Sequence, residues 1–482
     1  MTNVKNGKTQ ASLFELHGIP KFAEALPLAL QHVVAMVVGC ITPAIIVGNA
    51  VGVTPAEMIM LVQAALVTAA LATAVQIYPI FGRVGAGIPV VMGVSFAYVP
   101  VLLSIGTQYG LPALFGAQVA GGITAILVGL FIKPLRKFFP PIVSGTVVFT
   151  IGLSLYPVAI RYMAGGAGNP EFGSLRNWGV ALFTMAMVTF FNHFTKGFMK
   201  LASILLGLIA GYAVALSLGM VSFQNVNSAG WIALPKPFYF GFEFPPHAVI
   251  AMVIMFVVNS IQAIGDISAT TVGAMDREPT DRELAGGIMG NGLGSLFGTL
   301  IGGMPTATFS QNVGIVTITR VINKFVIAIA AVVILIAGLI PKFSALLTTI
   351  PQCVLGGATI TVFAAITMTG MKLIVSAKMT SRNTAVVGIA VALGVGVSQV
   401  GGALGGPGMP GWVGNIFGSA SVMIATIAAV LLNIVIPKDK CDEPLPAETA
   451  AEIYEDPCEV EAGLEEMTKE INEISEIISK DE

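Results

Sequence analysis

The chain has 482 residues, of which 55% are hydrophobic and only 10% are charged, and its formal net charge is −2. Soluble domains carry roughly 25% charged residues, so this composition excludes an ordinary soluble protein and predicts an all-α polytopic membrane protein. The four cysteines indicate neither a disulfide framework nor metal-ligand spacing. We therefore expect no metal and no cofactor, and we expect no nucleic-acid partner.

Residues 1–24 form a polar N-terminal segment without the apolar core of a cleavable signal peptide. The apolar runs that follow are long enough for membrane helices, which take about 20 residues each. They predict fourteen spans, at residues 25–48, 55–79, 86–106, 111–133, 141–163, 177–194, 201–219, 247–273, 285–303, 306–321, 323–341, 344–370, 381–401 and 411–437.

The charges around these spans predict their orientation. An even number of spans places both termini on one side of the membrane. Before the tail, sixteen lysine and arginine residues fall on that side, and only Arg161, Arg176, Lys236 and Lys342 fall on the other. Because cytoplasmic loops carry the excess of positive charge, we expect a multi-pass protein of the cell membrane with both termini in the cytoplasm.

Two spans at corresponding places in the two halves contain stretches that interrupt a helix. Span three holds Gly85–Pro89 and Gly93–Ala97, and span ten holds Pro305 followed by the extended stretch Thr306–Phe309. We expect Ser310 to be the N-cap of the helix that restarts after it. Non-helical backbone in a membrane lines a cavity or is buried in protein, and paired breaks indicate an inverted repeat with a transporter's binding site between its halves.

Polar side chains also occur inside otherwise apolar spans. Asp266 lies within span eight, and Gln262 lies four residues earlier on the same helix face. An ionisable residue inside the membrane predicts a substrate or ion site; the alternative is a polar seam that joins helices. His32 in span one is either part of such a site or a buried hydrogen-bonded residue, and Asn291 in span nine is by itself a packing residue.

Gln311 and Asn312 follow the interruption in span ten. A glutamine amide presents an acceptor and a donor pair in one plane, which suits the edge of a planar heterocycle. Phe96 offers an aromatic face, and the helix start at Gln311 offers N–H donors to carbonyl oxygens or negative charge. These residues predict a transporter of a small polar solute.

The stretch Gln311–Arg320, QNVGIVTITR, resembles the signature of the nucleobase–ascorbate transporter family, also called nucleobase:cation symporter-2. That signature reads Gln/Glu/Pro-Asn-x-Gly-x-x-x-x-Thr-Arg/Lys/Gly, and all five constrained positions match. Other stretches that resemble the family are Gln31-His32, Pro140–Thr146, Gln262–Asp266 and Pro351–Gly357. The resemblance covers nearly the whole membrane region.

The resemblance implies fourteen spans in two inverted seven-span repeats, with short strands in spans three and ten. A core domain would hold the substrate, and a gate domain would form a homodimer while the core moves against it. The implied division is a core part at 25–136 and 247–341, a gate part at 137–220 and 342–437, an extracellular loop at 221–246, and the acidic cytoplasmic tail at 438–482.

The resemblance also assigns roles to residues. Gln311 would hold one edge of a purine base and Gln262 the other, with Phe96, Ala97 and Ala307 around the ring. His32, Asp266, Asn291 and Asn312 would support the site or couple it to protons. Glutamine as first signature residue is typical of xanthine and uric acid carriers, whereas uracil carriers have glutamate there.

Two departures from the family pattern bear on coupling. The family usually has glutamate at the position of Gln262, and many purine members have aspartate at that of Asn291. Because neither residue here takes up a proton, an uncoupled facilitator or another coupling ion is an alternative to proton symport. A uracil or other nucleobase permease, and an anion carrier or channel of the same fold, are further alternatives; nothing indicates an enzyme.

The acidic tail carries one regular pattern. Its apolar residues Met467, Ile471, Ile474 and Ile478 lie at spacings of three and four, so they form one stripe of a helix. We interpret the stretch as a solvated tail that packs weakly on the cytoplasmic face. A helix that binds a regulatory partner is the alternative.

Overall fold

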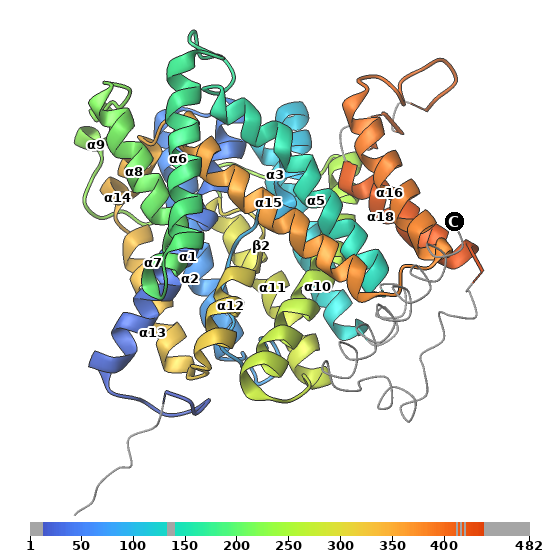
Figure 1. Cartoon of the computed structure of the whole chain (residues 1–482), viewed down its shortest axis with the longest axis horizontal. Helices are drawn as coiled ribbons and strands as arrows, with labels where there is room; N and C mark the ends of the chain where they lie inside the picture. The colour runs from blue at the N-terminus through green and yellow to red at the C-terminus, as the bar shows by residue number, and fades with distance from the viewer. Residues whose placement is uncertain (1–12, 133–139, 411–412, 415–416, 419–420, 438–482) are drawn as a thin grey trace, which may run out of the picture. The chain divides into compact units, whose positions relative to one another are not determined.

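The structure, a computed structural model of the chain, describes residues 13–132, 140–410, 413–414, 417–418 and 421–437 (Figure 1). The predicted tail lies outside the described residues. The helices are α1 (Phe22–Val51), α2 (Pro55–Ile77), α3 (Val99–Leu130), α5 (Pro141–Met163), α6 (Leu175–Phe194), α7 (Phe198–Leu201), α8 (Ser203–Ser217), α9 (Gln224–Ser228), α10 (Pro246–Met275), α11 (Asp281–Ile301), α12 (Ser310–Thr319), α13 (Lys324–Gly338), α14 (Pro341–Thr348), α15 (Gln352–Ser376), α16 (Ser381–Gln399) and α18 (Ser421–Val435). The strands β1 (Met92–Val94) and β2 (Thr306–Thr308) and the short 3₁₀ helix η1 (Phe96–Tyr98) complete the described elements.

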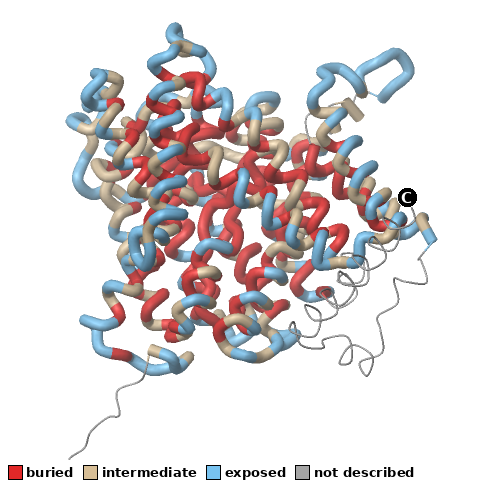
Figure 2. Tube along the Cα trace, viewed as in Figure 1, coloured by how far each residue is buried: buried red, intermediate tan, exposed pale blue. Residues whose placement is uncertain are grey.

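Most of these helices are apolar. Within the described residues, eight helices are long and apolar enough to cross a bilayer, and a ninth span results if the bent pair α13 and α14 is counted as one. The prediction of a predominantly helical membrane protein is confirmed, and the fourteen-span layout stays a prediction. Buried residues lie in the middle of the helices, whereas many of the connecting loops are exposed (Figure 2).

The helices pack in two groups. The first helix group contains α1, α2, α3, α10, α11 and α13; here α3 lies against α10 and α11, and α2 lies against α13. The second helix group contains α5, α6, α8, α15 and α18, in which α15 packs along α5 and α6. Each helix makes most of its contacts within its own group.

The two strands meet inside the first helix group. They pair antiparallel, with Met92 opposite Thr308 and Gly93 opposite Ala307, and all six strand residues are buried. The Thr73 hydroxyl of α2 donates to the Met92 carbonyl at 3.1 Å and accepts from the Met92 amide at 2.9 Å. Because lipid offers no hydrogen bonds, this pairing supplies the partners that non-helical backbone needs in a membrane.

One predicted helix boundary is wrong. The span at 344–370 is interrupted, since α14 ends at Thr348 and α15 begins at Gln352 after Pro351, which lacks an N–H group. Helix α14 is bent by 81° from α13. The predicted break between spans three and four falls inside α3, at Gly110, whose backbone is not helical (φ 83°, ψ −179°).

The predicted N-cap role of Ser310 is also wrong. Helix α12 begins at Ser310 itself, after Phe309 in an extended conformation, and the N-cap position makes no side-chain hydrogen bond. The Ser310 hydroxyl instead donates to Asp266 Oδ1 at 2.8 Å. A hydrogen bond to a carboxylate is roughly twice as strong as one between neutral groups, so it prevails over local capping.

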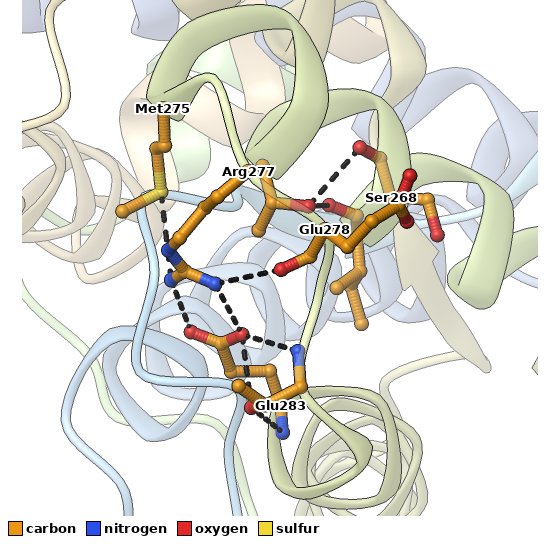
Figure 3. Close-up of polar contacts among 8 residues, drawn as sticks. Ser268, Met275, Arg277, Glu278 and Glu283 are labelled. Carbon is orange, nitrogen blue, oxygen red and sulfur yellow. Dashed lines mark hydrogen bonds and ion pairs between the residues drawn. The ribbon is translucent and has the colours of Figure 1, made fainter.

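An arginine–glutamate pair holds the corner between α10 and α11. Arg277 donates to both carboxylate oxygens of Glu283, at 2.9 and 2.6 Å (Figure 3). Glu283 also accepts from the Thr280 amide at 2.8 Å, which closes a capping box at the start of α11. The hydrogen bonds from Arg277 to this carboxylate raise the pKa of the guanidinium, so the pair is charged at neutral pH.

Small residues bring α5 and α15 together in the second helix group. A Cβ atom at Gly145 would lie 2.7 Å from the Ile374 backbone nitrogen, and one at Gly152 would lie 2.6 Å from the Thr367 backbone nitrogen. Real Cβ atoms do not approach backbone this closely. The two helices therefore pack at a distance that only glycine permits at these positions, as is common between membrane helices.

We predict that Gly152→Ala destabilises the protein, because the added methyl group forces α5 away from α15. Overpacking of this kind costs about 1–3 kcal/mol. The measurement is the thermal midpoint of the purified protein in detergent. Gly388→Ala is the matched control, since nothing lies within 4 Å of a Cβ atom there. Equal midpoints for the two variants would contradict this account of the α5–α15 packing.

Candidate functional site

A cavity of about 630 Å³ lies between the two helix groups. Its size falls within the roughly 300–1,000 Å³ of small-molecule sites. On the side of the first group it is lined by the chain from Ser95 to Ala97, by α10 and by the start of α12. On the other side it is lined by α5 and α15. The lining is mostly apolar, with a few polar side chains concentrated on α10 and around Ser310.

The carboxylate of Asp266 joins α10 to the interrupted stretch. It is 8% exposed and lines the cavity. Its Oδ1 accepts from the Ser310 hydroxyl, and its Oδ2 accepts from the Thr308 hydroxyl. Two hydroxyl donors satisfy a charge that would otherwise be costly in an apolar setting. The same bonds fix where α12 starts relative to α10.

Two glutamines face the same cavity. Gln262 lies one helical turn before Asp266 on α10, and Gln311 lies in the first turn of α12. The first N–H groups of a helix have no partner within that helix. Around Gln311 the cavity therefore meets both a side-chain amide and a helix N-terminus, which favour a carbonyl oxygen or a negative charge.

Phe96 and Ala97 line the cavity from η1, directly after β1. The Phe96 ring packs edge-on against Phe363 of α15, with the ring centroids 5.1 Å apart. Ser95 accepts a hydrogen bond from the Ala97 amide at 3.2 Å, which turns the chain from strand into η1. The aromatic wall of the cavity is thus set by the end of β1 and supported by the second helix group.

The remaining predicted residues lie behind the cavity. Asn312 Nδ2 donates to the His32 carbonyl at 3.0 Å and lies 3.0 Å from His32 Nδ1. Since that amide nitrogen is the donor, Nδ1 is the acceptor and the ring proton is on Nε2. Asn291 Oδ1 accepts from the Thr306 hydroxyl at 2.9 Å. Ala307 is buried in β2 and does not line the cavity.

Two groups of residues at the site were not predicted from the sequence. The hydroxyls of Thr308 and Ser310 both donate to Asp266. Ser144 of α5 and Thr369 of α15 line the opposite wall. Thr308 and Ser310 flank Phe309, after which helix α12 begins, and this pattern of polar residues could have indicated the first group. The second group could not be predicted in this way, because its position depends on how the two helix groups meet.

Comparison with known proteins identifies the class. The family model described as "Permease family", with the short name Xan_ur_permease, matches residues 23–402. The chain therefore belongs to this permease family, the nucleobase–ascorbate transporter family that its signature resembles. Members of the family are transporters rather than enzymes.

Individual relatives agree with that assignment. The chain is 36% identical over 420 residues to the uric acid permease PucK of Bacillus subtilis (strain 168), covering 85% of this chain and 95% of the relative. It is 36% identical over 388 residues to the xanthine permease of the same organism, covering 79% and 86%. It is 31% identical over 464 residues to the xanthine permease XanQ of Escherichia coli (strain K12), covering 91% and 97%.

Solved structures share the fold at low sequence identity. The transmembrane domain of a cyanobacterium bicarbonate transporter, BicA, superposes with a TM-score of 0.53 at 19% identity, covering 84% of this chain and 97% of that chain. The structure of SLC26A9 gives a TM-score of 0.55 at 9% identity, covering 86% and 66%. These likenesses concern the fold alone.

We predict that Thr308→Val lowers stability, because valine keeps the shape of threonine but removes one donor from the Asp266 carboxylate. Leaving a buried charged group short of a hydrogen bond costs about 1–3 kcal/mol. The measurement is the thermal midpoint in detergent, and Thr308→Ser is the control that retains the hydroxyl. A midpoint for Thr308→Val equal to that of the serine variant would contradict the role of this hydroxyl.

Proposed function

We propose that this protein is a secondary active transporter that imports a purine nucleobase, xanthine or uric acid, across the cytoplasmic membrane, with protons as the coupling ion. The observation that carries the proposal is that Gln262 and Gln311 line one cavity together with Phe96. Relatives named as xanthine and uric acid permeases support the substrate class.

The recognition chemistry follows from the two amides. A purine such as xanthine presents alternating N–H and C=O groups along the edges of a planar ring. A glutamine amide offers an acceptor and a donor pair in one plane, so Gln262 and Gln311 complement two such edges. The Phe96 ring stacks on or against the base. The free N–H groups at the start of α12 add donors for a carbonyl oxygen.

Alternating access uses the two helix groups. We propose that they are the core and gate domains of fourteen spans arranged as two inverted seven-span repeats, with the gate domain forming a homodimer. The cavity extends from the glutamines to Ile132, Pro141 and Leu373, at the ends of elements that the charge pattern places on the cytoplasmic side. At the other end, Asn49 of α1 donates to the Tyr162 hydroxyl of α5 at 3.1 Å. A cavity that reaches the cytoplasmic end and a hydrogen bond that joins α1 to α5 at the other end support an inward-facing state.

Proton coupling rests on Asp266. Among the described residues that line the cavity, Asp266 is the acidic one, and it contacts the same stretch that carries Gln311. Gln262 and Asn291 stand where the family usually or often has acids, and neither takes up a proton. We therefore assign the coupling proton to Asp266, whose protonation would weaken its hold on Ser310 and Thr308 at the start of α12.

The anion-carrier alternative is less well supported. Among the described lining residues there is no lysine or arginine, and a carboxylate is present. An anion site of high affinity needs compensating positive charge once water is removed. The paired amides fit a neutral planar ligand better.

We predict that Gln311→Ala lowers uptake of labelled xanthine or uric acid at least about tenfold, as expected from losing roughly 1.5–3 kcal/mol of hydrogen bonding. Uptake is measured in transporter-deficient cells and normalised to the amount of protein in the membrane. Gln224→Ala, in an exposed loop helix, is the control. Unchanged uptake would remove Gln311 from the site.

The same cells test the proposed substrate class. If the wild-type protein carries uracil but neither xanthine nor uric acid, the proposed specificity is wrong. If it carries none of these bases, the proposed function is wrong.

We predict that Asp266→Asn abolishes the dependence of uptake on external pH. In the wild-type protein, uptake should rise as external pH falls and should decrease when a proton ionophore is added, because the imported proton binds this carboxylate. An asparagine variant with residual uptake should respond to neither treatment. A flat pH profile in the wild-type protein, or a variant that keeps the wild-type slope, would exclude coupling through Asp266.

A further inference from the structure

The loop between α8 and α10 has a fixed backbone. Ala233 donates to the Leu339 carbonyl at 3.2 Å, Phe238 donates to the Leu300 carbonyl at 2.8 Å, and Glu243 donates to the Pro112 carbonyl at 2.9 Å. These carbonyls stand at the ends of α13, α11 and the second half of α3. The loop therefore runs across one end of the first helix group and is held there at several points.

The side chains of this fixed loop are strongly apolar and exposed. Trp231 is 70% exposed, Ile232 is 84% exposed and Leu234 is 76% exposed. A cluster of this kind is costly in water, at about 25 cal/mol per Å² of apolar surface, and marks a surface that meets another apolar phase. The exposed chain around α9 and α14 is visible at the edge of the molecule in Figure 2.

This surface continues an apolar face of a membrane helix. Val332 and Ile336 of α13 are each 54% exposed, and Ile336 lies about one turn before Leu339, to which Ala233 is bonded. At that point α14 leaves α13 at 81°. Helix α14 buries Ser344 and Ala345 and leaves Leu346 41% exposed. Helix α14 thus begins where the spanning helix α13 ends, and the loop is bonded to the chain at the same place.

Lysine side chains accompany the exposed aromatic residues. Lys342 of α14 places its ammonium group 4.4 Å from the centre of the Trp231 ring, and its amide donates to the Gly230 carbonyl at 3.2 Å. Lys236 lies 5.7 Å from the centre of the Tyr239 ring. Tryptophan, tyrosine and lysine at the end of a spanning helix are the residues that favour the headgroup region of a bilayer.

We propose that Trp231–Leu234 together with α14 form an interfacial anchor, which inserts its apolar side chains at the boundary between headgroups and acyl chains of the outer leaflet. Lys342 and Lys236 bind phospholipid phosphates from the same position. Gln63 of α2 donates to the Gly338 carbonyl at 3.0 Å and to the Ala233 carbonyl at 3.4 Å. The anchor is thereby attached to α2 and α13.

The attachment has a consequence for the first helix group. Because the loop also binds the end of α11 and Pro112 in the second half of α3, the anchor is joined to four helices of this group. Under the proposed function, the anchor therefore belongs to the core domain. The lipid contact itself does not depend on that function.

The test uses tryptophan fluorescence in lipid vesicles. The protein has three tryptophans, so Trp178→Phe together with Trp412→Phe leaves Trp231 as the only one. In phosphatidylcholine brominated near the headgroup, we expect Trp231 emission to fall roughly twofold or more, and to be quenched less by bromines deep in the chains. Iodide added to the water should quench it weakly.

Two results would overturn the anchor. Strong iodide quenching without an effect of brominated lipid would place Trp231 in water, and protection from both quenchers would place it against protein, such as a second copy of the chain. If the doubly substituted protein does not fold, the same comparison is made between the wild-type protein and Trp231→Phe, whose difference in quenching reports on Trp231. Nucleobase uptake by the same variants separates failure of the anchor from failure of the proposed function.

Discussion

Peptide groups that leave helical form inside a membrane must find partners in the protein, and the rest of this structure depends on how that constraint is met. Two three-residue strands, far apart in the chain, satisfy each other by antiparallel pairing. Each strand is followed by a new helical segment, η1 after β1 and α12 after β2. The pairing therefore brings the starts of two helical segments, with Phe96 and Gln311, to the wall of one cavity.

Asp266 connects this arrangement to the neighbouring helix. Its carboxylate accepts from hydroxyls on both sides of Phe309, one in β2 and one in α12. Because both bonds go to a single titratable group, a change in its charge acts on the position of Gln311. The carboxylate proposed to carry the proton thus bonds the residues directly before Gln311, and this is the physical basis of the proposed coupling between base and proton.

The sequence was sufficient for the features that follow from composition and local pattern. Apolar runs predicted a helical membrane protein, and Pro305 with the threonines after it indicated an extended stretch where β2 lies. The spacing of Gln262 and Asp266 predicted that they share a helix face, and both line the cavity. The pattern did not show that Ser310 bonds Asp266 rather than capping α12, because that choice depends on how close α10 lies. It likewise did not show the bend at α14 or the position of Ala307 behind the cavity wall.

The central claim is that one planar base lies between the two glutamines, with Phe96 against it. The most direct measurement is an experimental structure of the protein with xanthine bound. We expect density for the base in the cavity, with the Gln262 and Gln311 amides at hydrogen-bond distance from its edges and the ring against Phe96. Density for xanthine elsewhere, or a bound base that neither glutamine contacts, would contradict the account.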